Sequence, residues 1–317
     1  MRVDGLGRHI YSDVSWFLSL LPDGVQEEIF TTTEGRGCAS FTPGTSRAVP
    51  HDDGFLVTGR WAFQTGSPDA EWALVPALID SGAAPPSLAI FVMPASAITV
   101  LDDWYTTGLR GSGSNSVTAQ DVYVPGERVL PVTEESKRLG SRQSEANGGT
   151  GLYDIPLPTF ILTSVGAFCG LARGALELLI ERLPGRDIAY TGYSERSEAA
   201  LTHLQVAGAA TGIRAAHGLF FEVADRIDDH VETREPYSVE EQSLMWANVG
   251  YAVGLCADAV NTIRLASGAS AIQETNPMQR MVRDMSALSS HAFMVPTTGL
   301  EVYGRVVCGQ GPNSPLL

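Results

Sequence analysis

Two side chains far apart in the sequence could take part in proton chemistry. Thr65, in the segment FQTG (63–66), offers a small hydroxyl that both donates and accepts hydrogen bonds. His291, in the segment SSHA (289–292), offers an imidazole whose pKa lies near neutrality, which suits proton transfer. Threonine is also favoured in strands for its β propensity, and a lone histidine more often packs or faces solvent. These residues alone therefore leave a purely structural use of both open.

A second suggestive segment is WYTTGLRGSGSNSVTAQDVYVP, residues 104–125. Its glycines can adopt positive φ angles in a tight turn, and residues 117–124 are rich in strand-forming side chains. We therefore predict a strand, a turn that carries Ser112 and Ser114, and a second strand. A glycine-rich dinucleotide-binding loop would be followed by a helix, so this segment is not predicted to be one.

Short apolar runs separated by turn residues predict an antiparallel β-domain, a sandwich or a barrel, over residues 37–133. Residues 1–36 are predicted to form a remnant helical segment. Residues 134–151 are polar and rich in glycine, serine and asparagine, which predicts a linker. Strands are expected at 54–59, 72–79, 88–93 and 117–124, and helices at 12–20 and 24–30.

Over residues 152–317 the hydrophobic period becomes helical and predicts an up-down four-helix bundle. Ser238 and Glu241 form a capping-box pattern at the start of the third helix. Pro296 is expected to kink or break the fourth helix, because proline cannot donate the helical hydrogen bond. The four helices are expected at 157–183, 194–231, 238–266 and 277–304.

The chain has 317 residues and a formal net charge of −15, which disfavours nucleic acid and anionic membranes as partners. Its four cysteines form no CxxC pair and predict free thiols in a reducing cytoplasm. The histidines and cysteines lack metal-ligand spacing, so no metal is predicted. No export leader and no long apolar span are seen, so a cytoplasmic protein that does not cross a membrane is expected.

Four segments together resemble the acyl-CoA dehydrogenase fold and, more narrowly, the oxygenase components of two-component flavin-dependent monooxygenases. They follow the order and spacing of that family, and the similarity extends from about Ser12 to the C-terminus. The fold class that this implies is α+β, with remnant N-terminal helices, a central β-domain and a C-terminal four-helix bundle. The segments are GRWAFQTGSPDAEW (59–72), residues 104–125, GLARGALELLIERLPGR (170–186) and NPMQRMVRDMSALSSH (276–291).

The resemblance implies an enzyme that uses O2 and reduced FMN or FAD, with the flavin supplied by a separate flavin reductase. A flavin C4a-hydroperoxide would hydroxylate an aromatic or phenolic small molecule, such as a polyketide-like compound of natural product biosynthesis. The sequence has no pyridine-nucleotide fingerprint, which agrees with a separate reductase. The resemblance also implies a homotetramer, or a dimer, assembled through the bundle.

Roles for individual residues follow from the same resemblance. In the family the flavin lies between the β-domain and the bundle, and an arginine, often from a neighbouring subunit, binds its phosphate. Arg182, one turn before Arg186, is a competing candidate for that phosphate. The resemblance implies catalysis by His291 and Thr65, flavin contacts from Phe63, Thr65, Ser40, Arg186, Gly268 and Ser270, and substrate contacts from Ser112, Ser114 and Trp104.

One departure separates this chain from the acyl-CoA dehydrogenases. Their catalytic glutamate follows an Arg-Asp pair, which is present here as Arg283-Asp284, but Ala292 or a near neighbour stands at the carboxylate's position. Without that base, removal of a proton from a thioester is disfavoured. Two alternatives stay open: an N-oxidising monooxygenase of the amino-sugar type, and a degenerate, non-catalytic family member. The second is motivated by an N-terminal domain that the resemblance indicates is shortened.

Overall fold

The computed structural model describes residues 13–80, 82, 86–132, 162, 164–233, 237–314 and 316–317. The chain divides into two compact units. Unit 1 comprises Met1–Thr106, Arg110–Thr163 and His230–Arg234, and unit 2 comprises Thr107–Leu109, Ser164–Asp229 and Glu235–Leu317. The linker predicted at 134–151 lies outside the described residues, as do residues 1–12 of the predicted N-terminal segment.

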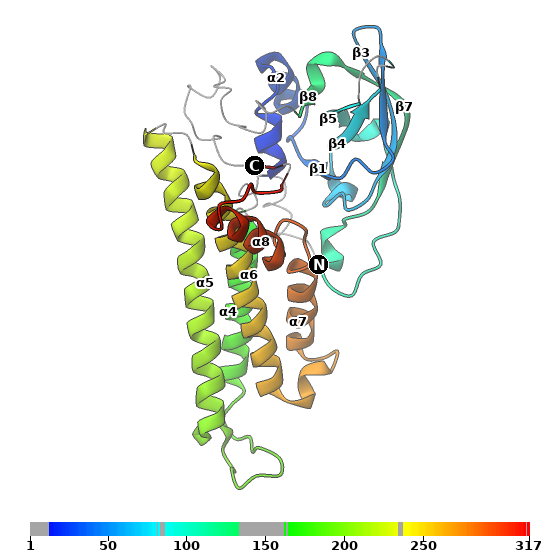
Figure 1. Ribbon diagram of the computed structural model, residues 1–317. Coiled ribbons are helices and arrows are strands. Elements are labelled where there is room, and N and C mark those ends of the chain that lie inside the picture. The colour runs from blue at the N-terminus through cyan, green and yellow to red at the C-terminus, as the bar shows by residue number, and fades with distance from the viewer. Residues whose placement is uncertain are drawn as a thin grey trace. The chain divides into compact units, whose positions relative to one another are not determined.

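Unit 1 is built on an eight-stranded sheet with the order β6-β7-β3-β2-β4-β5-β8, and β1 pairs with β4 beside this path (Figure 1). Residues 13–18 and α2 (Asp23–Thr32) are helical and precede the sheet. The four strands expected from the sequence lie within β3, β4, β5 and β7. The strands are β1 Gly37–Ala39, β2 Arg47–His51, β3 Gly54–Trp61, β4 Trp72–Ile79, β5 Ser87–Pro94, β6 Thr99–Val100, β7 Val117–Pro125 and β8 Val129–Pro131.

The sheet differs from the prediction in two respects. It is mixed and not purely antiparallel, because β1 and β2 both run parallel to β4. The connections from β1 and β2 to β4 are longer than a two-residue turn. The chain can therefore cross back before β4 begins, and β4 runs parallel to both strands. The hairpin predicted for residues 104–125 is wrong in its first half: residues 104–109 form no strand, and β7 pairs with β3 and β6.

Alternating side chains of the long strands form the core of unit 1. The pairing of β3 with β7 contains a β-bulge. Val57 pairs with Val122 while Gly59 pairs with Ala119, so β7 carries an extra residue. Asp121 adopts a φ of 47° there, and its carboxylate accepts a 2.8 Å hydrogen bond from the Thr58 hydroxyl. The core side chains include Val57, Trp61, Ala73, Val75, Ala77, Ala89, Phe91, Met93, Val117, Ala119 and Val124.

Unit 2 is helical, and α6 is its centre (Figure 1). α6 is buried along most of its length and packs against α4, α7 and α8. The predicted capping box is confirmed: the Ser238 hydroxyl accepts from the Glu241 amide, and the Glu241 carboxylate accepts from the Ser238 amide. No helix in the described part of the chain combines the length and apolar composition needed to cross a membrane. The helices are α4 Val165–Glu181, α5 Ala200–Thr233, α6 Val239–Ser267, α7 Pro277–Leu288 and α8 Pro296–Val307.

Two of the predicted helices change at their ends. The fourth, expected at 277–304, is divided into α7 and α8, and Pro296 occupies the first turn of α8, where its missing N–H is tolerated. The second begins at Ala200 and not at residue 194, because a turn of 3-10 helix (Arg196–Glu198) precedes it. The part of the predicted 157–183 helix before residue 162 lies outside the described residues.

A short segment of unit 2, Thr107–Leu109, is held against α7 by the Arg283-Asp284 pair. The Leu109 amide donates to the Asp284 carboxylate at 2.8 Å, and the Arg283 guanidinium donates to the Thr107 carbonyl. Gly108 lies so close to α7 that a Cβ atom on it would fall 2.1 Å from the Arg283 carbonyl oxygen. The Arg-Asp pair therefore has a structural task in this chain.

This close approach predicts the effect of adding one methyl group at Gly108. We expect Gly108→Ala to lower the free energy of unfolding by about 1–3 kcal/mol, because the backbone must move away from α7. Gly218→Ala is the matched control, since no atom lies within 4 Å of a Cβ there and α5 would gain helix propensity. Denaturant unfolding of both variants measures the difference, and equal stabilities would contradict the packing.

Candidate functional site

Three hydroxyl side chains of unit 1 form a hydrogen-bonded chain, here called the hydroxyl cluster: Thr65, Ser114 and Ser112. Thr65 Oγ1 lies 2.9 Å from Ser114 Oγ, which lies 2.7 Å from Ser112 Oγ. Both serines are buried, whereas Thr65 is partly exposed. Each hydroxyl can donate or accept, so the direction of the whole chain can reverse without creating a charge. The cluster can therefore present either a donor or an acceptor at Thr65.

Backbone hydrogen bonds between two loops bring these hydroxyls together. The Gln64 amide donates to the Asn115 carbonyl at 3.1 Å, and the Gly66 amide donates to the Ser112 carbonyl at 2.9 Å. The Ser67 hydroxyl adds a 3.0 Å bond to the Gly113 carbonyl. Residues 63–66 follow the end of β3 at Trp61 and form a turn, so Thr65 does not lie on a strand.

Asn115 joins a third loop to the first two. Its side-chain oxygen accepts from the backbone amides of Asp103 (3.4 Å) and Trp104 (3.2 Å). In return, the Asp103 carboxylate accepts from the Ser116 amide at 2.8 Å and pairs with Arg60 at 2.9 Å. The bond from the Ser116 amide, followed by Arg60, holds the pKa of Asp103 below its ordinary value. Asn115 thus fixes the loops that carry Thr65, Trp104 and the two serines.

Two aromatic rings accompany the hydroxyl cluster. Phe63 and Trp104 meet edge to face, with centroids 6.1 Å apart, and the Phe63 side chain is 69% exposed. Phe63 also adopts a φ of 61°, a left-handed conformation that is costly for an aromatic residue. The hydrogen bonds of the neighbouring Gln64 hold it there. An aromatic pair beside hydroxyls, with the Phe63 ring exposed and Trp104 half-buried, suits a planar ring that carries polar atoms.

Two buried polar atoms nearby have no hydrogen-bond partner among the described residues: Ser40 Oγ and Gln64 Oε1. Both residues are anchored at the Leu74 carbonyl, by the Ser40 amide at 3.4 Å and Gln64 Nε2 at 3.5 Å. An unpaired buried oxygen carries a free-energy cost that a ligand or a water relieves. For Ser40, predicted to contact a flavin, the free hydroxyl fits that prediction.

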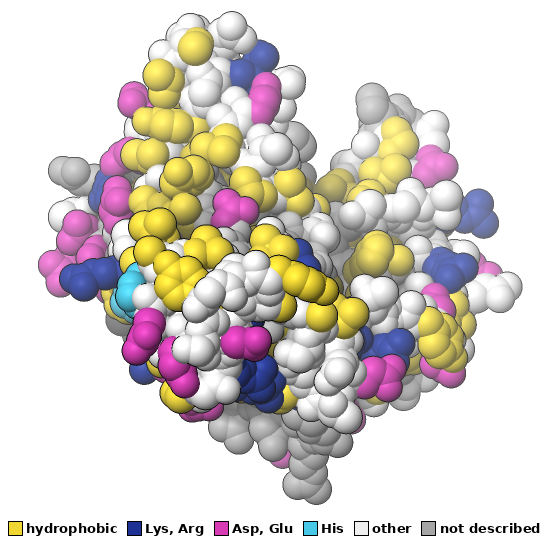
Figure 2. All heavy atoms as spheres, turned by 90° about the horizontal axis from the view of Figure 1, so that it is seen from below, with side chains coloured by type: hydrophobic (Ala, Val, Ile, Leu, Met, Phe, Trp, Pro, Cys, Tyr) yellow, Lys and Arg dark blue, Asp and Glu magenta, His cyan; other side chains and the backbone are white. Residues whose placement is uncertain are grey.

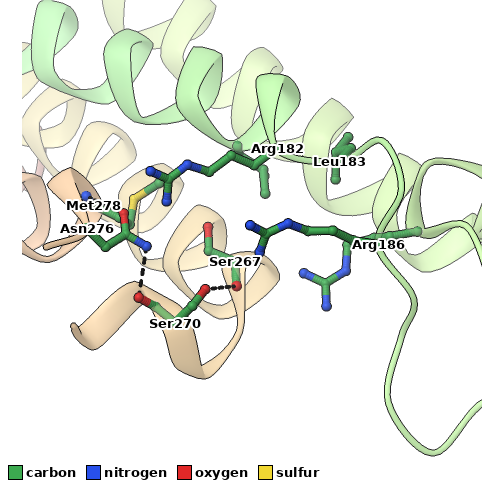
Figure 3. A pocket seen from close by; sticks show the side chains of 9 residues that line it. Arg182, Leu183, Arg186, Ser267, Ser270, Asn276 and Met278 are labelled. Carbon is green, nitrogen blue, oxygen red and sulfur yellow. Dashed lines mark hydrogen bonds between the residues drawn. The ribbon is translucent and has the colours of Figure 1, made fainter.

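A pocket of unit 2 collects positive charge at the ends of α4 and α6 (Figure 3). Arg182 and Arg186 line it together with Ser267 and Ser270, and Arg196 completes the set. None of the described residues that line it is acidic. Three guanidinium groups around a pocket with no acidic residue among its described lining residues, in a chain of net charge −15, suit an anion such as phosphate. This arginine pocket joins Arg186 and Ser270, both predicted to contact the cofactor, to the competing Arg182.

Local backbone geometry shapes the arginine pocket. Gly268 ends α6 with a φ of 73°, which directs the chain into the short 3-10 helix Ala269–Ile272. The Asn276 side chain donates to the Ser270 carbonyl at 2.8 Å, and Arg196 Nη1 donates to the Ala266 carbonyl at 2.8 Å. The predicted loop of Gly268 and Ser270 is therefore placed beside the arginines.

His291 lies in the turn between α7 and α8, and not on a helix as predicted. Its Nδ1 accepts a 3.4 Å hydrogen bond from the Phe293 amide, so the neutral ring carries its proton on Nε2. The ring stays accessible to solvent, yet desolvation by the atoms around it lowers its pKa below the ordinary value of 6.5. Ala292, beside it, is exposed and offers no base.

Sequence reasoning missed three residues that shape these sites: Asn115, Arg196 and Gln64. Asn115 could have been found from its place after two glycine-serine pairs, where an asparagine side chain commonly bonds to nearby backbone. Nothing in the sequence indicates that Arg196 lies near Arg186. The two become neighbours because residues 186–196 form a closed loop, in which the Arg196 amide donates to the Arg186 carbonyl.

Comparisons with known proteins place this geometry in context. Residues 162–296 match the family model "Acyl-CoA dehydrogenase, C-terminal domain". The FADH(2)-dependent resorcinol hydroxylase, oxygenase component, of Rhizobium sp. (strain MTP-10005) is 29% identical over 88% of this chain and 70% of its own. The oxygenase subunit HsaA of Rhodococcus jostii (strain RHA1) is 29% identical over 92% and 76%. XiaF from Streptomyces sp., solved with FADH2 and glycerol, has a TM-score of 0.87 at 26% identity and covers 98% of this chain and 78% of its own.

Over most of its length the chain is similar to the oxygenase components of flavin-dependent monooxygenases. Its acyl-CoA dehydrogenase-like fold confirms the fold predicted from the four sequence segments. The roles of individual residues in this chain stay predictions. The structure brings Thr65, Ser112, Ser114, Phe63 and Trp104 together in unit 1, and Arg186, Gly268 and Ser270 together in unit 2.

The position of Asn115 predicts that its side chain keeps the three loops of unit 1 in register. We expect Asn115→Ala to lower the free energy of unfolding by about 1–3 kcal/mol, because two backbone amides lose their acceptor. Asn115→Asp keeps an acceptor oxygen and should lose less. Asn261→Ala, whose exposed side chain bonds only to Arg264 in the same helix, is the control. An Asn115→Ala variant as stable as this control would contradict the role of Asn115.

The environment of His291 predicts its titration. The pKa of His291 is lower in the folded chain than in the unfolded chain, so below pH 6.5 the unfolded chain binds more protons. The contribution of His291 to stability is therefore present above pH 6.5 and is lost as the pH falls below that value. NMR titration of the ring protons, assigned with a His291→Gln variant, should give a midpoint below 6.5. A midpoint above that value would show that a negative charge, and not desolvation, dominates around the ring.

Proposed function

We propose that this chain is the oxygenase component of a two-component flavin-dependent monooxygenase and that it hydroxylates an aromatic or phenolic small molecule. The observation that carries the proposal is the similarity, over 88% of the chain or more, to oxygenase components such as resorcinol hydroxylase and HsaA. Bound reduced flavin supplies the activation of O2. We propose reduced FAD as that flavin, because XiaF was solved with FADH2 and the resorcinol hydroxylase is FADH(2)-dependent by name.

The hydroxyl cluster is proposed to bind the polar edge of the flavin ring. A reduced flavin presents an N–H group and an oxidised one presents an acceptor nitrogen, so the hydroxyl beside it must serve both states. Thr65 can do so because Ser114 and Ser112 can reorient with it, at distances of 2.9 and 2.7 Å. Phe63 and Ser40 are proposed as further flavin contacts, and Trp104, Ser112 and Ser114 as contacts of the aromatic substrate.

His291 is proposed to act on the substrate's hydroxyl group or to donate a hydrogen bond during oxygen transfer. Desolvation keeps the imidazole neutral at physiological pH, and its Nδ1 is occupied by the Phe293 amide. The neutral ring can therefore donate through Nε2. To take up a phenol proton, the ring would have to exchange its Phe293 bond, since Nδ1 is the only unprotonated nitrogen.

The arginine pocket is proposed to bind the flavin's phosphate groups. Arg186 and Arg182 supply planar donors that fit phosphate oxygens in pairs, and the pocket lining adds the Ser270 hydroxyl. Gly268 is proposed to let the backbone approach the cofactor closely, as its positive φ already requires glycine. No step of the reaction is assigned to this pocket; its contribution is binding energy.

We also propose a homotetramer, with a dimer as the alternative, and a transient complex with a flavin reductase in the cytoplasm. Support for assembly comes from large apolar side chains on the surface of unit 2, such as Leu204, which is 73% exposed. Hydrophobic side chains gather on the face of the molecule seen in Figure 2. Patches of this kind are typical of subunit contacts. Exposed residues of the helices include Leu201, Leu204, Phe221, Tyr251, Leu265 and Val307.

The phosphate assignment predicts how Arg186 affects flavin binding. Arg186→Ala should raise the Kd of reduced FAD by roughly 10- to 100-fold, the loss of about 1.5–3 kcal/mol expected for a charge-assisted hydrogen bond. Arg173→Ala is the control, because Arg173 lies on α4 but pairs with Glu177 on the exposed surface. Anaerobic titrations of both variants with reduced FAD and reduced FMN provide the dissociation constants. Identical affinities for the two variants would show that Arg186 does not bind the flavin.

The reaction itself is tested by product analysis. The protein, a flavin reductase, NADH, FAD and O2 are incubated with a panel of phenols and a matched panel of amines. We expect a hydroxylated phenol whose formation requires both the chain and the reductase. Oxidation at nitrogen only, or failure to bind either reduced flavin, would overturn the proposal and favour the N-oxidising or the non-catalytic alternative.

A further inference from the structure

Two of the four cysteines face each other inside the helices of unit 2. Cys169 lies on α4 and Cys256 on α6, and both are free thiols. Cys256 is fully buried, whereas Cys169 is partly exposed. Neither residue belongs to the hydroxyl cluster or to the arginine pocket.

The packing of the two helices places the thiols at the same level. α4 and α6 pack against each other, and their C-terminal ends meet in the arginine pocket, where Leu179 and Ser267 both line the wall. Cys169 precedes Leu179 by ten residues and Cys256 precedes Ser267 by eleven. At ~1.5 Å per residue, both thiols therefore lie about 15–17 Å from the pocket along parallel helices.

Each cysteine also lies on the face that its helix buries. Cys169 follows the buried Phe168 and lies one turn from Val165 and Ala172, and Cys256 lies one turn from Val253 and Val260. The two thiols lie close enough to affect each other's ionisation: Cys256 lowers the pKa of Cys169, whereas Cys169 and burial raise the pKa of Cys256. Cys169 is therefore the thiol that ionises first.

We propose that Cys169 and Cys256 form a peroxide-sensitive dithiol that closes to a disulfide between α4 and α6. The Cys169 thiolate attacks one oxygen of hydrogen peroxide, the O–O bond breaks, and the products are a sulfenic acid and, after proton uptake, water. The sulfur of Cys256 then attacks the sulfenic sulfur, an S–S bond forms, and a second water leaves with the Cys256 proton. In sum, two thiols and one peroxide give one disulfide and two waters.

The oxidant is hydrogen peroxide, and its source rests on the proposed function. An enzyme that combines reduced flavin with O2 releases peroxide whenever no substrate receives the oxygen atom. The peroxide released by the enzyme would then oxidise the cysteines of α4 and α6, the two helices that end at the arginine pocket. The disulfide would add a covalent link between two helices that pack against each other, and thiol reductants would reopen it.

Disulfide mapping tests the proposal without any flavin. The full-length protein is treated with a small excess of hydrogen peroxide, its remaining thiols are alkylated, and a non-reducing digest is analysed by mass spectrometry. We expect the Cys169 and Cys256 peptides to be joined and two of the four thiols to be lost, with full recovery in dithiothreitol. Cys256→Ala should instead leave a sulfenic acid on Cys169 that dimedone traps.

Cys308→Ala is the matched control, because Cys308 is exposed and far from the pair in sequence, and this variant should still form the disulfide. In the unmutated chain, the proposal would be overturned by any of three results: four intact thiols, oxidation of Cys308 alone, or a sulfinic acid on Cys169 without a cross-link. A separate incubation with reductase, FAD and O2, with and without catalase, tests the peroxide source. A disulfide with added peroxide but not in this incubation would count against the proposed function alone.

Discussion

The structure of unit 1 depends on one constraint: the buried amide of Asn115 must satisfy its hydrogen bonds. Its side chain accepts from two backbone amides of the Asp103-Trp104 loop, and its carbonyl accepts from Gln64. Through these bonds Phe63 is kept at a positive φ and Thr65 within reach of Ser114. A site of this kind gains its precision from neutral hydrogen bonds on rigid loops, which cost no reorganisation when a ligand arrives.

In unit 2, the ligand proposed for the arginine pocket is an anion, and the protein that would bind it carries a net charge of −15. Binding would require the long-range repulsion from that charge to be outweighed locally, and three arginines around a pocket with no acidic residue among its described lining residues would provide the attraction. The backbone around the pocket is shaped by the positive φ of Gly268 and by the bond from the Asn276 side chain to the Ser270 carbonyl. The proposed phosphate contacts and the proposed flavin-ring contacts thus come from side chains of different character, charged arginines and neutral hydroxyls.

Much of this arrangement could be predicted from the sequence where local rules decide. The four long strands, the capping box of Ser238 and Glu241, and the break at Pro296 all follow from alternation, side-chain chemistry and the missing proline N–H. Residues 104–109 were mistaken for a strand because Gly108 and the Arg283-Asp284 pair, distant in sequence, decide their conformation. Asn115 and Arg196 escaped notice for the same reason: their partners become neighbours only after folding.

In the proposed reaction this chain transfers one atom of O2 to an aromatic ring with electrons from reduced flavin. The most direct measurement is a single turnover in 18O2 with chemically reduced FAD and a phenol hydroxylated in the product screen, followed by mass spectrometry. We expect one 18O atom in the new hydroxyl group and at most one product molecule per reduced flavin. A hydroxyl oxygen derived from water, or product formed equally without the protein, would contradict it.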